Sequence, residues 1–411
     1  MFGNVRSNKG FTLVEMVIVM AIFVIVIGIT GSAFNRIVTQ ALSLTKTAES
    51  NIAGIVGLEL MRVDVEAAGY GLPWSFSQPI TYSEATAVQG TALNDNDRTY
   101  ASDPTQNNVP RAIMSTNNIV STDQAVVFNG SDVMTVRGQT VATNTASKRW
   151  TYIESAVRPD TNPNPDKHRW SADNLADTDR VVLINPIANL KPTNQLVVNS
   201  TSGSWTAPFN NYSTIGKPPV YNDAEKKSDA YIIYGVDGST DLRMPFNRAD
   251  FYVRRPAASE NGYLKLPQRC NPSTGVLFKG VVRQDTGAYQ EFPLLECVLD
   301  MQVVYELRTA GSNIPTNSDV LNTQPPDVVR PLTPQEVREQ VKAVKVYILT
   351  HDGGRDRNYT YPNTTISVGP GDGTGSTYNF ATSGIPDWQN YRWRVYQIVA
   401  RPSNLTGNIS Q

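Results

Sequence analysis

Residues able to do chemistry are scarce in this sequence. Its 411 residues include two histidines, His168 and His351, and two cysteines, Cys270 and Cys297. A metal centre built on imidazole and thiolate ligands needs three or four of them close together. A catalytic cysteine needs a histidine base beside it, and the sequence places no histidine next to either cysteine. These counts argue against a zinc-type centre and against cysteine chemistry.

Three short motifs could still form a small site. GPGDGTG at 369–375 resembles a phosphate-binding loop but lacks the Gly-Lys-Ser/Thr ending, so a plain turn is favoured. His351 and Asp352 could do acid–base chemistry, but no nucleophile motif accompanies them and an exposed loop pair is favoured. Asp352, Asp356 and Asn358 form a weak candidate calcium loop whose spacing does not match an EF-hand. We therefore expect no enzyme, no cofactor and no bound metal.

One carboxylate lies where a charge is costly. Glu15 falls within an apolar block, and no charged residue occurs from Met16 to Asn35. About 20 apolar residues in a helix span the ~30 Å hydrocarbon core of a bilayer, so residues 16–35 are predicted to cross a membrane. Burying a carboxylate there costs about 2.5–3.5 kcal/mol even on lenient scales, so Glu15 needs a partner. The basic residues Arg6 and Lys9 place the start of the chain in the cytoplasm and the remainder outside it.

This first segment resembles the type IV prepilin signature. KGFTLVEMVIVMAI at 9–22 contains a Gly10–Phe11 junction and a glutamate at the fifth position after it. The resemblance implies that a prepilin peptidase removes the leader peptide, residues 1–10, and that the new amino group of Phe11 is methylated. It also implies that Glu15 pairs with the terminal amine of a neighbouring subunit, which would relieve two costly charges at once. A cleaved secretory signal would be shorter, and a plain membrane anchor leaves Glu15 unexplained.

A long helix must carry this segment. No proline occurs between Phe11 and Pro73, and apolar residues recur at helical spacing beyond the membrane. We predict a helix from Phe11 to about Glu66, closed by Gly71 and Pro73, whose outer half lays an apolar stripe on the globular part. The expected stripe comprises Ile37, Ala41, Leu44, Ala48, Ile52 and Ile55.

Beyond the helix, short β-branched runs between turn residues predict a β-rich head over 67–411. The fold class is therefore α+β, a long N-terminal helix packed on a β-rich head. The expected strands are 126–128, 132–136, 181–184, 296–307, 342–349 and 391–399, with a strand–turn–strand unit formed by 230–236 and 250–254. Two segments rich in Asn, Thr and Asp, 85–125 and 140–180, are expected to be long surface excursions.

The last third of the chain has the clearest local patterns. Apolar and polar residues alternate along 296–307, which predicts a strand with one buried face. Thr333-Pro-Gln-Glu336 is a capping box that opens a short helix. Because the head is placed outside the cytoplasm, Cys270 and Cys297 are expected to form a disulfide, although two separate buried thiols remain the alternative. Closing the loop would add about 3–4 kcal/mol of stability.

Patterns in the head resemble the PilW-like minor pilins. They are AGYG at 68–71 and the order of LLECVLDMQV, EVREQVKAVKVYIL and YRWRVYQIVARP, although Arg401-Pro402 departs from the usual Arg-Asn ending. The resemblance implies a minor pilin of a type IV pilus, in a tip or priming complex, with other major and minor pilins and the pilus assembly platform as partners. The protein would wait in the inner membrane and then reach the pilus on the cell surface. A minor pseudopilin of a type II secretion system and a pilin-stemmed adhesin are the alternatives.

Net charge indicates no nucleic-acid partner. The 36 basic and 37 acidic residues almost balance, so the chain has no general electrostatic footprint for a phosphate backbone.

Overall fold

A computed structural model of the chain describes residues 12–154, 174–188, 191–199, 202–210, 230–260, 262–308, 314–323 and 329–405. The chain divides into two compact units, Met1–Ile52 and Ala53–Gln411. The described part of the first unit is helical throughout apart from its first residue, and the second unit holds every strand. The fold class is the predicted α+β.

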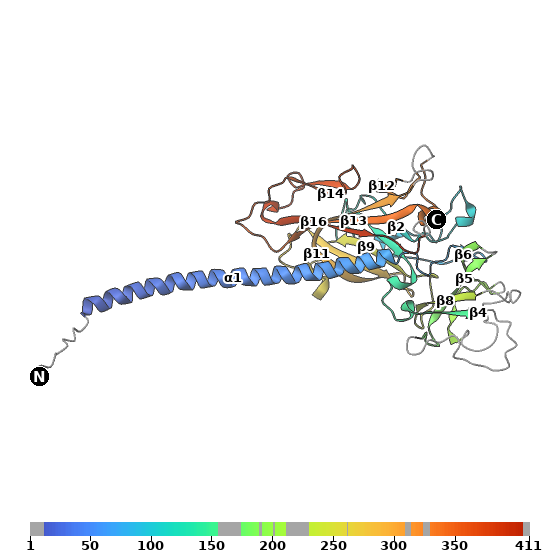
Figure 1. Ribbon diagram of the computed structural model, residues 1–411, viewed down its shortest axis with the longest axis horizontal. Coiled ribbons are helices and arrows are strands. Elements are labelled where there is room, and N and C mark those ends of the chain that lie inside the picture. Colours follow the sequence, from blue (N-terminus) through green and yellow to red (C-terminus); the bar gives the residue numbers. More distant parts are fainter. Residues whose placement is uncertain are drawn as a thin grey trace, which may run out of the picture. The chain divides into compact units, whose positions relative to one another are not determined.

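Helix α1 runs from Leu13 to Glu66 (Figure 1). It ends where two glycines take backbone conformations that side chains disfavour, with φ of +83° at Gly69 and +64° at Gly71. The Gly69 amide then donates to the carbonyl oxygen of Arg137 at 2.8 Å, which fixes the end of the helix to the head. The predicted end of the helix and its glycine signal therefore agree with the structure.

A large antiparallel sheet forms the centre of the head. Its strand order is β16-β13-β11-β10-β9-β3-β2, with β12 paired to β11. The strands are β2 (Ile113–Ser115), β3 (Met134–Arg137), β9 (Arg248–Arg254), β10 (Gly275–Val282), β11 (Tyr289–Leu307), β12 (Thr316–Ser318), β13 (Val341–Asp352) and β16 (Arg392–Ala400). The predicted strands at 132–136, 296–307, 342–349 and 391–399 are confirmed here.

A second sheet has the order β1-β6-β5-β8-β4, with β7 paired to β5, and Figure 1 shows β4, β5, β6 and β8 close together. They are β1 (Ser75–Phe76), β4 (Trp150–Glu154), β5 (Arg180–Ala188), β6 (Lys191–Leu196), β7 (Ala207–Pro208) and β8 (Ala230–Asp237). A separate hairpin pairs β14 (Thr365–Val368) with β15 (Ser376–Asn379). The short helices are α2 (Val88–Thr91), α4 (Pro334–Gln340), η1 (Pro104–Gln106), η2 (Gln139–Val141), η3 (Ala146–Lys148), η5 (Gly262–Leu264) and η6 (Trp388–Asn390).

Some local expectations about the head are wrong. Strands β8 and β9 do not form a hairpin, because β8 lies in the second sheet and β9 in the large one. The connection between them is longer than the two to five residues of a hairpin loop. Residues 126–128 form no strand, since Val126 ends a turn and the next two residues are irregular. Strand β4 lies inside the excursion expected at 140–180, of which residues 155–173 lie outside the described residues. The capping box is as predicted: Thr333 N donates to Glu336 Oε2 at 2.8 Å, and Glu336 N donates to Thr333 Oγ1 at 3.3 Å.

The last turns of α1 pack on β11 through a stripe of small and apolar residues. The buried stripe comprises Gly54, Gly57, Leu58, Met61 and Val65. Ile55, expected in this stripe, is instead 57% exposed, so that part of the prediction is wrong. The other members predicted for the stripe have side chains outside the described ones. Two glycines allow the close approach, since a Cβ on Gly57 would overlap the carbonyl oxygen of Leu294.

This contact makes Gly57→Ala destabilising. In an exposed helix, alanine for glycine would add about 1 kcal/mol of stability. Here the new methyl group would clash with the backbone of Leu294, which cannot rotate away as a side chain can. Overpacking of this kind typically costs about 1–3 kcal/mol or more of stability. We expect a net loss of about 2 kcal/mol in the free energy of unfolding of the detergent-solubilised full chain, followed by tryptophan fluorescence in urea. Gly238→Ala, where nothing lies within 4 Å of the added atom, is the matched control and should change little.

Strand β11 is buried on both faces, so the expectation of a single buried face is wrong. Asp300 is 5% exposed, and Gln302 is also buried. The β14–β15 hairpin covers part of the polar face, because Ser376 Oγ donates to Asp300 Oδ2 at 2.9 Å. Farther along β11, the amide of Val303 donates to Asp132 Oδ2 at 2.7 Å. Polar residues on this face therefore serve as internal hydrogen-bond partners.

The buried carboxyls predict a pH dependence. Burial raises the pKa of Asp300 to about 6 and that of Asp132 to about 7, against the hydrogen bonds that lower them. Such carboxyls titrate near pH 3.9 in an unfolded chain, so the folded state binds more protons between these values. The stability that the folded protein gains by binding these protons is fully present below about pH 4 and is lost as the pH rises through 6 to 7.

Asp300→Asn isolates this effect. The amide can accept from Gln302 Nε2 and donate to Ser376 Oγ, as the protonated carboxyl does. The variant should therefore match the stability of wild type at pH 4 and exceed it at pH 8, where the wild-type carboxyl is ionised. Urea unfolding at several pH values measures the difference. Asp356→Asn, a change at a surface ion pair, is the control. Parallel curves for wild type and Asp300→Asn would contradict the assignment.

The first expected excursion, 85–125, is held to the large sheet by buried charges. Glu84 Oε2 accepts from Arg137 Nε at 2.8 Å and from Arg248 Nη1 at 2.7 Å. Glu84 Oε1 accepts from the amide of Asp95 at 2.7 Å, and all four side chains are fully buried. The segment therefore contributes to the core as well as to the surface.

Candidate membrane and assembly site

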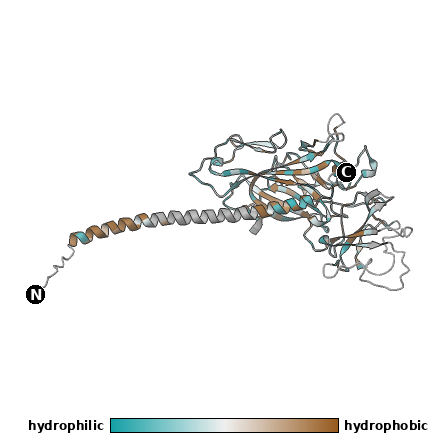
Figure 2. Ribbon diagram, viewed as in Figure 1, coloured by the Kyte–Doolittle hydropathy of each residue, from teal (hydrophilic) through white to brown (hydrophobic). Residues whose placement is uncertain are grey.

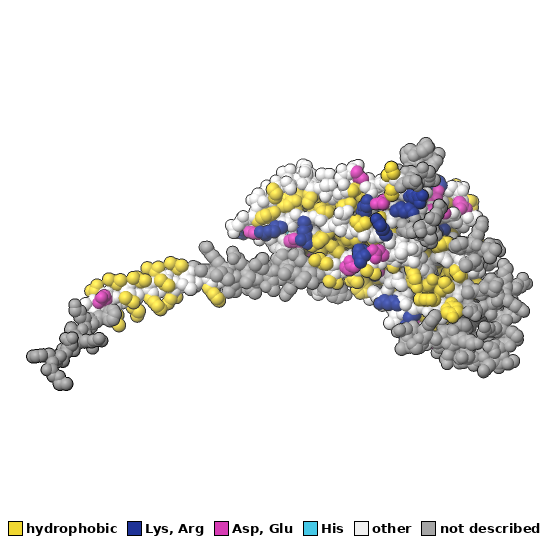
Figure 3. Space-filling model, viewed as in Figure 1, with side chains coloured by type: hydrophobic (Ala, Val, Ile, Leu, Met, Phe, Trp, Pro, Cys, Tyr) yellow, Lys and Arg dark blue, Asp and Glu magenta, His cyan; other side chains and the backbone are white. Residues whose placement is uncertain are grey.

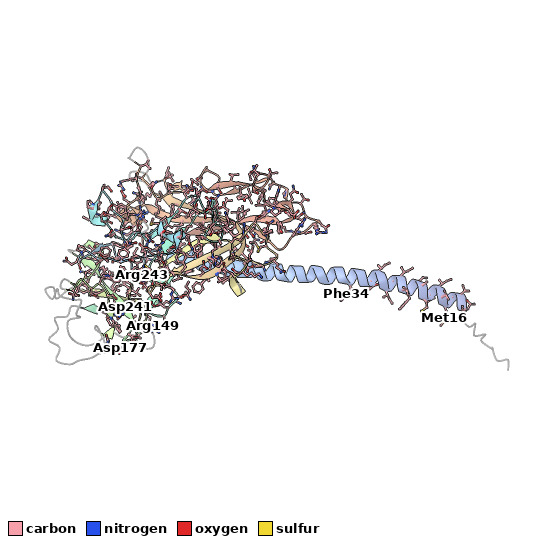
Figure 4. All side chains as sticks on the ribbon, turned by 180° about the vertical axis from the view of Figure 1, so that it is seen from behind. Met16, Phe34, Arg149, Asp177, Asp241 and Arg243 are labelled. Carbon is pink, nitrogen blue, oxygen red and sulfur yellow. A yellow bond between two sulfur atoms is a disulfide. The ribbon has the colours of Figure 1, made fainter. Side chains whose placement is uncertain are left out.

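The apolar part of α1 has the length and composition to cross a membrane. Within Leu13–Thr30, no residue is buried by the rest of the structure. At 1.5 Å per residue this stretch alone is about 27 Å long, close to the thickness of the hydrocarbon core. Figure 2 shows the stretch as predominantly hydrophobic, Figure 3 shows apolar side chains along its visible face, and Figure 4 shows Met16 and Phe34 projecting from the helix. Large exposed apolar surface of this kind marks a membrane or protein interface.

Glu15 begins this stretch in a capping box with Thr12. The Glu15 amide donates to Thr12 Oγ1 at 3.2 Å, and the Thr12 amide donates back to Glu15 Oε2 at 3.2 Å. Thr12 Oγ1 also lies 3.1 Å from Glu15 Oε2. Thr12 is not among the predicted site residues, although Thr-x-x-Glu is a capping-box pattern that the sequence displays. Gly10 and Phe11, the predicted cleavage and methylation residues, lie outside the described residues.

One carboxylate oxygen of Glu15 stays available. Thr12 engages only Oε2, and no described residue bonds to Oε1. A carboxylate that is half satisfied inside its own helix can still accept from a cation on another chain. The geometry therefore allows Glu15 to cap its helix and bind a partner at once.

The outer turns of α1 expose a second apolar face. Ile55, Val56, Leu60 and Val63 are each about half exposed on the side away from the buried stripe. Arg62 forms ion pairs with Glu59 and Glu66 along the same exposed side. A helix with apolar residues on two faces has one face for its own head and a second free for another partner.

The candidate calcium residues do not form a shared site. Asp352 Oδ2 pairs with Arg394 at 2.8 Å, and Asp356 Oδ2 pairs with Arg392 at 2.8 Å. Asn358 contributes its amide, which donates to Asp356 Oδ1 at 3.0 Å. Each carboxylate is thus engaged by a different arginine. In the described ranges, no group of three acidic, histidine or cysteine side chains is placed to hold a metal.

His351 lies in the core, so the expectation of an exposed loop pair is wrong. It sits on β13, is 3% exposed, and its Nε2 accepts from the amide of Asn271 at 2.9 Å. The rings of Tyr391 and Trp393 lie 4.5 and 5.1 Å away, centre to centre. Burial lowers the pKa of His351 to about 4, so the imidazole is neutral at physiological pH. It packs as an aromatic core residue and does not pair with Asp352.

The GPGDGTG motif and the cysteines have structural roles. Residues 369–375 connect β14 to β15, and no helix follows them, so the motif is the expected turn. Cys270 and Cys297 form a disulfide with their Cα atoms 4.9 Å apart, which ties the segment before β10 to β11.

Comparisons with known proteins find a family match for the N-terminal segment. Residues 5–31 match the family described as the prokaryotic N-terminal methylation motif, so the start of the chain is type IV prepilin-like. The comparison with curated proteins finds no match. A solved structure of a type IV-like pilin from Thermus thermophilus is 13% identical over 38% of this chain and 78% of that chain, with a TM-score of 0.18. A likeness that slight carries no argument about this chain.

Proposed function

We propose that this protein is a minor pilin of a type IV pilus, PilW-like, and that it acts in a tip or priming complex during pilus biogenesis. The observation that carries the proposal is the methylation motif at 5–31, which includes an exposed apolar stretch of helix with Glu15 in its first turn. A methylated, membrane-inserted helix with a carboxylate near its start is suited to assembly between subunits. The proposed function is structural and involves no catalysis.

The proposed route starts in the inner membrane, with the head outside the cytoplasm. A prepilin peptidase cleaves between Gly10 and Phe11, and the new Phe11 amine is methylated. Glu15 then pairs with the terminal amine of a neighbouring pilin, because each charge alone is costly in hydrocarbon. The exposed face around Leu60 would contact the helices of other major and minor pilins as the subunit leaves the membrane at the assembly platform.

The size of the head supports a place at the tip. The head begins at about Ala67 and extends to Gln411, and its two sheets and long connections form a large body. A repeating shaft favours compact heads, whereas a tip subunit has nothing stacked above it. Uniform density of this chain along sheared pili would contradict a tip position.

Deleting the gene tests the function against its alternatives. We expect surface pili to be lost, secreted proteins to be unchanged, and the wild-type gene to restore pili. Intact pili with failed secretion would instead assign the protein to a type II secretion pseudopilus. If neither the pili nor the secreted proteins change, the helix serves only to anchor a head that binds another molecule, as in a pilin-stemmed adhesin.

A further inference from the structure

Arg338 is a buried cation with no anion in direct contact among the described residues, and the charge of Glu339 acts on it only through space. It lies on α4, is 6% exposed, and its guanidinium carbon is 4.9 Å from the centre of the Trp74 ring. Within the described part of the chain, it makes no ion pair and no hydrogen bond. The adjacent Glu339 is exposed, and its Oε1 accepts from Gln335 Nε2 at 2.8 Å. Burial lowers the pKa of Arg338 to about 10, as expected for a desolvated cation.

Arg338 opens into a pocket of about 280 Å³. The walls come from segments far apart in the sequence, and besides Arg338 and Glu339 they comprise Trp74, Ser75, Gln106, Thr193 and Gln335. Gln106, at the end of η1, is 7% exposed, and its buried Oε1 has no hydrogen-bond partner. An unpaired donor and an unpaired acceptor therefore line the same pocket. A buried donor or acceptor that forms no hydrogen bond is unfavourable, so a ligand that bonds to both groups would be stabilised in this pocket.

The chemistry of the ligand follows from these two groups. A guanidinium fork matches a carboxylate with two parallel hydrogen bonds. The Gln106 oxygen needs a donor, which a hydroxyl group supplies, and Ser75 and Thr193 add hydroxyl partners. The indole of Trp74 provides an apolar wall. Glu339 at the pocket disfavours a doubly charged phosphate and leaves a single carboxylate as the better fit.

We propose that this pocket binds a sugar acid, a molecule or glycan residue that carries one carboxylate and neighbouring hydroxyl groups. The carboxylate binds Arg338, and a ring hydroxyl donates to Gln106 Oε1. The volume suits one such residue, near the lower end of known ligand pockets. Binding here is independent of whether the protein assembles into pili.

Calorimetric titration of the detergent-solubilised full chain tests the proposal. Sodium glucuronate should bind saturably with a dissociation constant below about 1 mM, and glucose, which lacks the carboxylate, should not. Arg338→Met should weaken glucuronate binding at least about tenfold, because it keeps the length and apolar stem but removes the donors. Arg283→Met is the matched control, since Arg283 pairs with Asp285 on the exposed surface, and it should bind as wild type does.

Thermal unfolding keeps the test decisive if a variant folds poorly. Glucuronate should raise the melting temperature of wild type and of Arg283→Met, and leave that of folded Arg338→Met unchanged. Binding to an immobilised glucuronate-terminated glycan would identify a surface glycan as the source, and binding to the free acid alone would identify a soluble ligand. The proposal is overturned if folded wild type shows no saturable binding at about 10 mM glucuronate, or if glucose or Arg338→Met binds equally well.

Discussion

A strain producing Glu15→Ala should make the protein, insert it in the membrane and fail to assemble pili. Without the carboxylate, the terminal amine of the neighbouring subunit has no anion in the hydrocarbon, where an unpaired charge costs several kcal/mol. A loss of that size lowers incorporation by at least about tenfold. Immunoblots of sheared pili and of membranes separate a failure of assembly from a failure of expression.

Two further variants separate the capping role of Glu15 from its proposed ion pair. Glu15→Gln keeps an oxygen that can accept from the Thr12 amide but removes the charge, so it should fail as alanine does. Thr12→Ala removes the hydroxyl bonded to Glu15 at a cost of about 1 kcal/mol of helix stability and keeps the charge. That variant should still assemble. Wild-type pili from Glu15→Gln, or equal failure of Thr12→Ala, would show that capping is the main role.

Glu84→Ala should cause the largest loss of stability in the head. One carboxylate binds the guanidinium groups of both Arg137 and Arg248, and all three side chains are fully buried. Removing it leaves two buried cations with fewer partners and frees the amide of Asp95. Breaking a buried ion pair from one side typically costs about 3–5 kcal/mol. Urea unfolding of the full chain, followed by tryptophan fluorescence, measures the change.

The control for Glu84→Ala removes one partner of an ion pair that is exposed to water. Asp285 pairs with Arg283 on the surface, so Asp285→Ala should leave the urea midpoint almost unchanged. Proteolysis adds a local readout, because cleavage near Asp95 should accelerate in Glu84→Ala and not in the control. A midpoint for Glu84→Ala equal to that of the control would contradict the role of the buried network.

The sequence alone was enough to predict the elements that depend on interactions between neighbouring residues. An uninterrupted run without proline predicts a helix to Glu66, and the structure ends it there. The apolar stretch from Leu13 to Thr30 needs no tertiary partner, since its environment is set by its own composition. The capping box at Thr333 depends on contacts three residues apart, so its residue types suffice to predict it.

Tertiary structure alone decided which faces are covered and which polar groups find partners. Alternation along β11 indicates a strand, but residues about 170 positions away bind its polar side chain Gln302, which donates to the carbonyl oxygen of Gly130. The separation of β8 from β9 depends on which sheet each strand joins, and a turn signal between them does not carry that information. In the sequence, Arg338 and Gln106 are ordinary polar residues, and only packing buries them in the walls of one pocket. Burial and partner choice are long-range properties, because each requires segments far apart in the chain to meet.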